Sequence, residues 1–380
     1  MSERISVVIP THNRSQLLSA ALDCVLSQSF PPAEIMVVDD GSVDATSALL
    51  DRYEGTLVRT IRIENSGHLV ARNVGLRAAS ADLVAFCDSD DLWRPSFLQM
   101  AMQLWRQAPD LTASYSNFAI VRDDQWSRLS KFETSPAGFW DDLQPIDANL
   151  GRFDTSLAER LIDFQPFFPT GMIVRKRAFI ALGGWDEYVS RIIGADFATA
   201  LRAGAHPPIG IMQQPLVGIR KHRTNLSSDT EKMNLGNACV LEHVLATRPE
   251  LTALTRKIHA SVAQRRRDAL DAAFTRRDLA EVRRIYHLIP PARRRPAARI
   301  KASVATLPAF VSTHVNEVAL RLGSAKASLV ALATAKPWAD AGRIKTWADA
   351  ARIKTWPDAA RMPRIDRTLP AGGFSPLTSR

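Results

Sequence analysis

The N-terminal part of the chain alternates short apolar runs with stretches in which apolar residues recur at helical spacing. Apolar, β-branched runs predict strands at residues 5–9, 35–38, 57–63 and 83–87. Between them, the spacing of Leu18, Leu22 and Val25 predicts one face of a helix, and two further helices are expected over residues 45–53 and 68–79. This alternation predicts an α/β fold, with a Rossmann-like, mostly parallel sheet flanked by helices.

Acidic residues follow two of these predicted strands. Asp39 and Asp40 end the second strand, and Asp88 and Asp90 follow the fourth. In an extended backbone, positions i and i+2 point the same way, so Asp88 and Asp90 can converge on one Mg²⁺ or Mn²⁺ ion. A solvated acidic turn or helix cap is the alternative for either pair alone. Two acidic pairs at the ligand-binding edge of one sheet favour a site.

Composition and cysteine content narrow the class of protein. The 380 residues are 46% hydrophobic and 23% charged, which excludes a wholly disordered or fibrous chain. Three widely separated cysteines exclude a disulfide framework and lack the spacing of a zinc site. The sequence has neither a signal peptide pattern nor a run of about 20 apolar residues. We therefore expect a protein of a reducing compartment, soluble or peripheral.

The charge is unevenly distributed along the chain. The formal net charge is +10, but residues 251–380 carry 25 basic against 9 acidic residues, whereas residues 1–250 carry 24 against 30. In a continuous helix, Arg266, Arg277 and Arg284 would form a basic stripe, either a solvated face or a dock for anionic lipids. Nucleic-acid binding is the rival interpretation. We expect no nucleic-acid partner, because the basic excess is confined to the tail and no recognised motif accompanies it.

Near the C-terminus, a nine-residue repeat begins at Trp338, Trp347 and Trp356. Pro357 and Pro363 interrupt any helix there, which predicts a disordered or interfacial tail, or a repeat expansion without function. The predicted organisation is an α/β domain with the candidate site over residues 1–235, a basic helical extension over 236–335 and a low-complexity tail over 336–380.

The motifs that follow the predicted strands resemble those of a known family. The segments 7–14, 35–46, 65–75 and 83–93 resemble the successive motifs of family 2 glycosyltransferases, and 168–187, 194–204 and 218–227 resemble the family's second half. The resemblance covers residues 1–230, with a poor match between 122 and 168. It implies the GT-A fold and an inverting enzyme that uses a nucleotide-sugar donor and a divalent cation, Mn²⁺ or Mg²⁺.

The resemblance also assigns roles to individual residues. Asp196 matches the family's catalytic base, and the implied metal ligands are Asp88, Asp90 and His222. The implied nucleotide-sugar-binding residues are Pro10, Thr11, His12, Asn13, Asp39, Asp40, Arg72, Asn73, Asp88 and Ser89. From the residues alone, alternatives stay open: a surface salt bridge for Arg72, a helix N-cap for Asp196 and a solvated side chain for His222.

Two positions depart from the family's pattern. His12 stands where the family usually has Tyr, and Ala195 replaces a Glu beside the base, so a catalytically inactive scaffold is the alternative function. The main expectation is transfer of a sugar, from a UDP-sugar, to a hydroxyl of a glycan or lipid-linked acceptor in polysaccharide and cell-envelope biosynthesis. The aromatic-rich segment 122–168 is expected to shape acceptor binding. The expected location is cytoplasmic, with peripheral contact on the anionic inner face of the plasma membrane.

Overall fold

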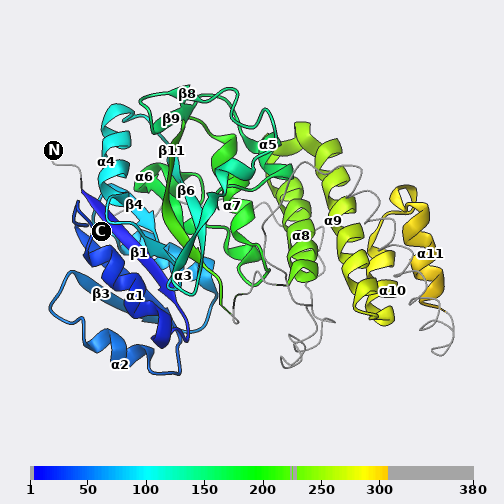
Figure 1. Cartoon of the computed structure of the whole chain (residues 1–380), viewed down its shortest axis with the longest axis horizontal. Coiled ribbons are helices and arrows are strands. Elements are labelled where there is room, and N and C mark those ends of the chain that lie inside the picture. Colours follow the sequence, from blue (N-terminus) through cyan, green and yellow to red (C-terminus); the bar gives the residue numbers. More distant parts are fainter. Residues whose placement is uncertain (1–3, 223–224, 226–228, 307–380) are drawn as a thin grey trace, which may run out of the picture. The chain divides into compact units, whose positions relative to one another are not determined.

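A computed structural model describes residues 4–222, 225 and 229–306. One sheet runs through it in the strand order β3-β2-β1-β4-β10-β6-β11-β9-β8, with β5 paired to β11 and β7 paired to β6 (Figure 1). The strands are β1 (Ile5–Thr11), β2 (Glu34–Asp40), β3 (Val58–Ile63), β4 (Leu83–Phe86), β5 (Leu92–Trp93), β6 (Ala113–Arg122), β7 (Gln125–Ser130), β8 (Gln144–Pro145), β9 (Leu150–Phe153), β10 (Met172–Arg175) and β11 (Ile209–Arg220).

Helices separate the first strands and follow the last one. They are α1 (Ser15–Leu26), α2 (Thr46–Asp51), α3 (His68–Ala78), α4 (Phe97–Gln107), α5 (Ala158–Asp163), α6 (Lys176–Ala181), α7 (Asp196–Ala205), α8 (Thr230–Thr247), α9 (Thr255–Thr275), α10 (Leu279–Leu288) and α11 (Pro296–Val304). The α/β class with flanking helices is confirmed by these elements.

The sheet is parallel over its first part and mixed beyond it. Strands β3, β2, β1 and β4 are all parallel neighbours, because each is reached through a helical crossover. Strand β10 then pairs antiparallel with both β4 and β6, while β6 and β11 are again parallel. The carboxyl ends of β2, β1 and β4 therefore lie along one edge, and this edge carries the acidic residues.

Alternate residues of the parallel strands face opposite layers of helices. On β1, Val7 and Ile9 pack in a cluster with side chains of α1, α2 and α4, such as Leu22 and Leu98. Val8 points the other way, into a cluster with side chains of α3 and α7. The sheet is thus buried on both faces, as continuous apolar runs predict.

Helices α8 and α9 are part of the second of these cores. Leu241 and Val244 of α8 and Ile258 of α9 are buried in the same cluster as Val8. The predicted domain boundary at residue 235 falls within α8, and the division itself stays a prediction. Helices α9, α10 and α11 also share a separate small core that includes Phe274, Ile285 and Val304.

The basic stripe predicted for the C-terminal region does not form, because its helix is not continuous. Helix α9 ends at Thr275, Arg277 has a left-handed φ of 64°, and the carboxylate of Asp278 caps α10 by accepting a hydrogen bond from the Glu281 amide at 3.0 Å. Arg277 therefore lies in a turn between two helices rather than on a helix face.

The chain divides into two compact units, Met1–Arg321 and Leu322–Arg380, and the second lies outside the described residues, as does the nonapeptide repeat. Cys24, Cys87 and Cys239 are free thiols, in keeping with the predicted lack of a disulfide framework. Within residues 4–222, 225 and 229–306, no helix combines the length and apolar character needed to cross a bilayer.

Candidate functional site

The site lies where β1, β2 and β4 end. Because these strands are parallel neighbours, the residues that follow Thr11, Asp40 and Phe86 meet at one edge of the sheet. Pro10, Thr11, Asp39, Asp40 and Ser89 are all buried there.

The loop after β1 is held against the loop after β2. Asn13 adopts a φ of 50°, and its side-chain oxygen accepts a hydrogen bond from the Val43 amide at 2.8 Å. The Asn13 amide donates to the Ser42 hydroxyl at 2.9 Å, and Nδ1 of exposed His12 lies 2.8 Å from the carbonyl oxygen of Asp40. Thr11 Oγ1 is buried without a hydrogen-bond partner among the described residues. In the structure, the end of the first predicted motif (residues 7–14) is thus hydrogen-bonded to the second (residues 35–46).

The two acids of β2 point into different loops. The Asp39 carboxylate accepts a hydrogen bond from the Ser42 amide at 2.8 Å and lies 3.7 Å from Nε of Arg62. The Asp40 carboxylate accepts hydrogen bonds from the amides of Ser66 at 2.7 Å and Gly67 at 2.9 Å, directly before α3. Asp40 therefore fixes the entry to the helix that carries Arg72.

The acidic segment after β4 is fixed by two distant residues. The Asp88 amide donates to the hydroxyl of Thr170 at 2.9 Å, and the Arg220 amide donates to the carboxylate of Asp91 at 3.0 Å. The Arg220 guanidinium also donates to the carbonyl oxygen of Asp90 at 2.5 Å. Burial raises the pKa of Asp91 well above its usual range, and the negative charges of Asp90 and Asp88 raise it further.

Arg72 is the buried cation of the site. It lies on α3, its side chain is 4% exposed, and its Nη2 is 2.5 Å from the Asp88 carboxylate. Its guanidinium carbon also lies 4.9 Å from the ring centre of Trp185. Nε and Nη1 have no hydrogen-bond partner among the described residues, although both are buried. Such donors cost about 1–3 kcal/mol each when left unsatisfied, so this guanidinium is suited to bind an anion.

Asn73, the neighbour of Arg72, is engaged by the protein itself. Its amide nitrogen donates to the Trp185 carbonyl at 2.9 Å and to the Glu187 carboxylate at 2.7 Å, and its oxygen accepts from the Trp185 amide at 2.8 Å. Gly184, at a φ of 62°, leaves room for this contact, because a Cβ there would lie 2.6 Å from the Asn73 oxygen. The structure therefore gives Asn73 a role in positioning Trp185, and its contact with a nucleotide stays a prediction.

The donor set at Asp88, Asp90 and His222 is chemically suited to a divalent cation. Oδ2 of Asp90 lies 2.9 Å from Nε2 of His222 and 3.7 Å from Nε of Arg14. No three His, Cys, Asp or Glu side chains are gathered into a metal cluster in the described part of the chain. Mg²⁺ usually takes only one or two protein carboxylates and completes its shell with water and substrate phosphates, so these residues fit such an ion.

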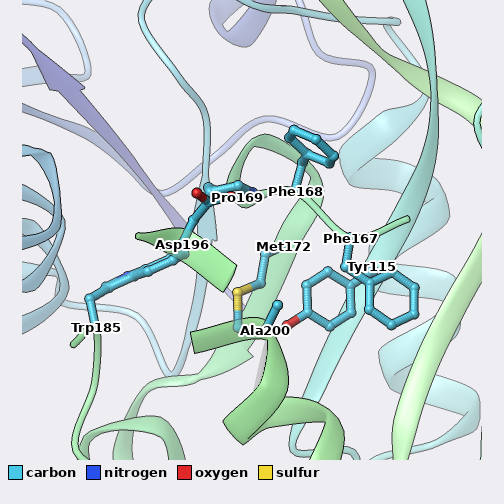
Figure 2. Close-up of a pocket in the computed structure, with 8 residues that line it drawn as sticks. All are labelled: Tyr115, Phe167, Phe168, Pro169, Met172, Trp185, Asp196 and Ala200. Carbon is cyan, nitrogen blue, oxygen red and sulfur yellow. The ribbon is translucent and has the colours of Figure 1, made fainter. Parts of the chain in front are cut away.

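Asp196 occupies the first position of α7. The N-cap of α7 is Ala195, and no side chain caps the helix. Burial raises the pKa of Asp196, the charge of Arg72 lowers it and that of Asp88 raises it. The carboxylate is therefore close enough to the predicted cation site to sense two of its charges. It also lines a small pocket with Tyr115, Phe167, Phe168, Pro169, Met172, Trp185 and Ala200 (Figure 2).

Three further residues of the site were not identified from the sequence. Thr170 holds the Asp88 amide, and Tyr115 lines the pocket beside Asp196. His68 opens α3 one turn before Arg72, and burial lowers its pKa to about 4, with Arg72 lowering it further and Asp88 opposing. The spacing of His68 and Arg72, four residues apart, is a signal that could have found the histidine. Thr170 and Tyr115 lie far from the other site residues in the sequence, and only the fold places them at the site.

The aromatic-rich segment contributes two residues to the pocket, Phe167 and Phe168. Phe167 stacks on Tyr115 with ring centres 4.3 Å apart, whereas Phe132, Phe139, Trp140 and Phe164 pack against one another beside it. The role of segment 122–168 in acceptor binding stays a prediction.

A Rossmann-like sheet with acids and a buried arginine at its carboxyl edge has the arrangement at which open α/β sheets bind ligands. Residues 6–182 match the sequence model described as Glycosyl transferase family 2. Over these residues, just under half of the chain, the protein is similar to glycosyltransferase family 2.

Individual relatives agree with this similarity. The amylovoran biosynthesis glycosyltransferase AmsB of Erwinia amylovora is 30% identical over 207 residues, which cover 52% of this chain and 63% of the relative. The UDP-Glc:alpha-D-GlcNAc-diphosphoundecaprenol beta-1,3-glucosyltransferase WfgD of Escherichia coli is 30% identical over 129 residues, which cover 34% and 50%. The chain spans about half the length of the curated relatives that it matches.

A solved structure shares the fold. The crystal structure of S. aureus TarS residues 1–349 in complex with UDP has a TM-score of 0.51 with this chain at 17% identity, and the match covers 84% of this chain and 92% of that one. At this identity the likeness concerns the fold alone.

Proposed function

We propose that this protein is an inverting glycosyltransferase that moves a sugar from a UDP-sugar to a hydroxyl group of a glycan or lipid-linked acceptor in polysaccharide or cell-envelope biosynthesis. The observation that carries the proposal is the position of Arg72. This buried guanidinium pairs with Asp88 and has two unsatisfied donors, and its charge offsets part of the rise that burial causes in the pKa of Asp196. The Arg72 guanidinium therefore interacts both with Asp88, at the acidic edge of the sheet, and with Asp196.

The choice of donor rests on relatives. WfgD is named for UDP-Glc, and TarS has been crystallised with UDP-GlcNAc. A UDP-sugar carries the diphosphate that the free donors of Arg72 would bind. WfgD is also named for a diphosphoundecaprenol-linked acceptor, and AmsB for amylovoran biosynthesis, which supports an acceptor in envelope or polysaccharide synthesis.

In the proposed mechanism, Asp196 acts as the general base. Its carboxylate takes the proton of the acceptor hydroxyl as the hydroxyl oxygen attacks the anomeric carbon, and the bond to the diphosphate oxygen breaks in the same step. This single displacement inverts the anomeric centre. Arg72 holds the departing diphosphate and stabilises the negative charge that develops on it. Asp88, Asp90 and His222 would hold a divalent cation, which when bound supplies Lewis-acid stabilisation of the diphosphate.

The proposal is tested by separating turnover from binding. We expect Asp196→Asn to lower UDP release from UDP-sugars by about 10²–10⁴-fold, because the amide cannot accept the proton. Calorimetry should show nearly unchanged UDP binding in the presence of Mn²⁺. Asp90→Ala should weaken both UDP binding and turnover.

The matched control is Asp154→Asn, because Asp154 is exposed and its partner Arg152 keeps Asp110. This variant should retain turnover. If Asp196→Asn turned over UDP-sugars at the wild-type rate, Asp196 would not be the general base. If the wild-type protein releases no UDP from any UDP-sugar, the alternative of an inactive scaffold, motivated by Ala195 and His12, is favoured.

A further inference from the structure

His68 adds an imidazole ring to the charged centre of the site. It is the first residue of α3 and lies four residues before Arg72. Residues at this spacing share one face of a helix, with Cβ atoms about 5–6 Å apart. Long side chains on a helix lean toward its N-terminus, so the Arg72 side chain extends toward His68. The imidazole and the guanidinium are therefore neighbours on one face of α3.

The charges of Arg72 and Asp88 both act on the His68 ring. Burial and the positive charge of Arg72 lower the pKa of His68 to about 4, and the negative charge of Asp88 opposes them. Near pH 7 the ring is therefore neutral, and Asp88 keeps its ion pair with Arg72. A neutral imidazole carries one N–H donor and one acceptor nitrogen. His68 thus adds a hydrogen-bond donor to the site without adding a charge.

No residue in the described ranges accepts a hydrogen bond from the His68 ring. Burial and two charges act on its pKa, with no hydrogen bond among the causes. The backbone on either side of it is engaged, because the Gly67 amide donates to Asp40 at 2.9 Å and the Leu69 amide donates to the Ser190 hydroxyl at 3.2 Å. The residue is half-buried rather than enclosed, so part of its surface is open to a ligand.

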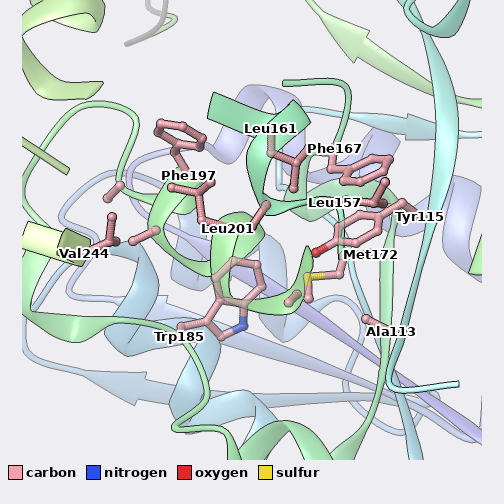
Figure 3. Packing of buried hydrophobic residues seen from close by; sticks show 14 of the residues in the cluster. Ala113, Tyr115, Leu157, Leu161, Phe167, Met172, Trp185, Phe197, Leu201 and Val244 are labelled. Carbon is pink, nitrogen blue, oxygen red and sulfur yellow. The ribbon is translucent and has the colours of Figure 1, made fainter. Parts of the chain in front are cut away.

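Arg72 is held in place beside this ring. Its guanidinium carbon lies 4.9 Å from the ring centre of Trp185, which is buried in the same apolar cluster as Val244 (Figure 3). Nη2 pairs with Asp88, whereas Nε and Nη1 have no partner among the described residues. An anion that satisfies these two donors lies next to the guanidinium, and therefore also close to the N–H group of His68.

We propose that His68 is a nucleotide-binding residue whose N–H group donates a hydrogen bond to a diphosphate oxygen of the UDP-sugar, beside the guanidinium of Arg72. The proposal rests on the proposed function, because it assumes that Arg72 binds this diphosphate. A neutral hydrogen-bond donor suits this place, since an imidazolium would compete with Arg72 for the carboxylate of Asp88.

The test measures UDP binding by calorimetry in the presence of Mn²⁺, which requires no turnover. We expect His68→Leu to raise the Kd for UDP at least about tenfold, because it removes a hydrogen bond to a charged group. His68→Gln and His68→Asn place an amide N–H group near the positions of Nε2 and Nδ1, respectively. One of these two variants should restore most of the affinity. Leucine and glutamine are both good helix formers, so α3 itself is preserved.

Uridine, measured by its displacement of UDP, isolates the phosphate contact, and its affinity should not change in His68→Leu. The matched control is His259→Leu, which alters an exposed histidine of α9 and should bind UDP as the wild-type protein does.

Three results would overturn the role of His68 while leaving the proposed function intact. They are an unchanged Kd for UDP in His68→Leu, no recovery in either amide variant, and an equal loss of affinity for uridine. Absence of UDP binding by the wild-type protein would instead count against the proposed function itself.

Discussion

At the scale of single residues, the site is organised by a few buried charges. Arg72 contacts Asp88 directly and influences both Asp196 and His68 through its charge. Burial strengthens these interactions because fewer water molecules screen them. The replacement of the usual Glu by Ala195 leaves Asp196 without an adjacent acid, and burial itself supplies a raised pKa.

The raised pKa of Asp196 predicts the pH range in which kcat falls as the solution is made more acidic. A general base works only when ionised, and a raised pKa means that Asp196 becomes protonated at a higher pH than an ordinary aspartate. Arg72 opposes this shift, and Asp88 and Asp196 repel each other. We therefore expect kcat to fall with decreasing pH while the pH is still above the ordinary aspartate pKa of 3.8.

This profile is measured as UDP release at saturating UDP-sugar, with circular dichroism at each pH to confirm folding. Asp154→Asn, a change at an exposed residue, should show the same fall of kcat with decreasing pH as the wild-type protein. A kcat that stays constant down to pH values near 3.8, in folded protein, would contradict a raised pKa for the base.

At the scale of elements, α3 and the turn that follows α6 are joined by close contacts. Gly75 lets α3 approach the sheet, because a Cβ there would lie 2.4 Å from a methyl group of Val8 and 3.2 Å from one of Val38. Two residues earlier on α3, Asn73 binds the backbone of Trp185. Helix α3 therefore places Arg72 and Trp185 together.

Asp186, the residue after Trp185, connects this turn to α8. Its carboxylate lies 3.1 Å from Nε2 of His243 and 2.6 Å from Nη2 of Arg248. Burial raises the pKa of Asp186, but the hydrogen bonds and charges of these two residues outweigh burial and lower the pKa to about 2.

We predict that Asp186→Asn lowers the free energy of unfolding near pH 7. The shift from 3.8 to about 2 corresponds to about 2 kcal/mol. A carboxylate with a depressed folded-state pKa stabilises the fold above its unfolded pKa and loses this contribution as the pH falls through the folded pKa. The difference from wild type should therefore shrink between about pH 4 and pH 2.

Urea unfolding across this pH range measures the effect. Asp163→Asn is the control, because Asp163 is 62% exposed in its pair with Lys257, and exposed pairs contribute below about 1 kcal/mol. Equal stabilities of Asp186→Asn and wild type at pH 7 would show that the Asp186 contacts do not stabilise the fold.

At the scale of the whole molecule, the C-terminal helices are continuous with the family domain over the described residues. Leu241 and Ile258 are buried in the same core as Val8 and Phe197. A truncation at residue 235 would expose this apolar surface. The family match ends at residue 182, whereas the structural core extends into the first half of α9.

Peripheral contact with an anionic membrane stays a proposal, and because the predicted stripe does not form, we propose α11 as its surface instead. Arg295 and Arg299 are exposed there, one turn apart, beside Ile300, which is 64% exposed. Each basic residue near an anionic membrane contributes about 1 kcal/mol. We predict co-sedimentation with vesicles rich in phosphatidylglycerol and none with pure phosphatidylcholine vesicles.

Arg299→Glu with Ile300→Glu should release the protein from these vesicles, and raised salt should do the same, because it screens exposed charges. Ile180→Glu, at an exposed position of α6, is the control and should bind as wild type does. Binding that persists in the α11 double variant would exclude this surface.

The sequence was sufficient for the α/β class and for the strand edge that carries the acids, because both depend on local patterns of apolar and polar residues. It did not predict the helix break at Arg277, since arginine is compatible with a helix and the break depends on Asp278 as a cap. It also missed Thr170, which reaches Asp88 from a position 82 residues away.

By itself, the sequence determined the first four strands, the helices between them and the motifs that resemble family 2 glycosyltransferases, because these are properties of neighbouring residues. Only the tertiary structure decided that Asn73 serves Trp185, that α8 and α9 belong to the main core, and that Tyr115 and Trp185 face one pocket beside Asp196. These contacts join distant segments, and burial, which leaves donors unsatisfied and shifts pKa values, exists only once those segments have packed together.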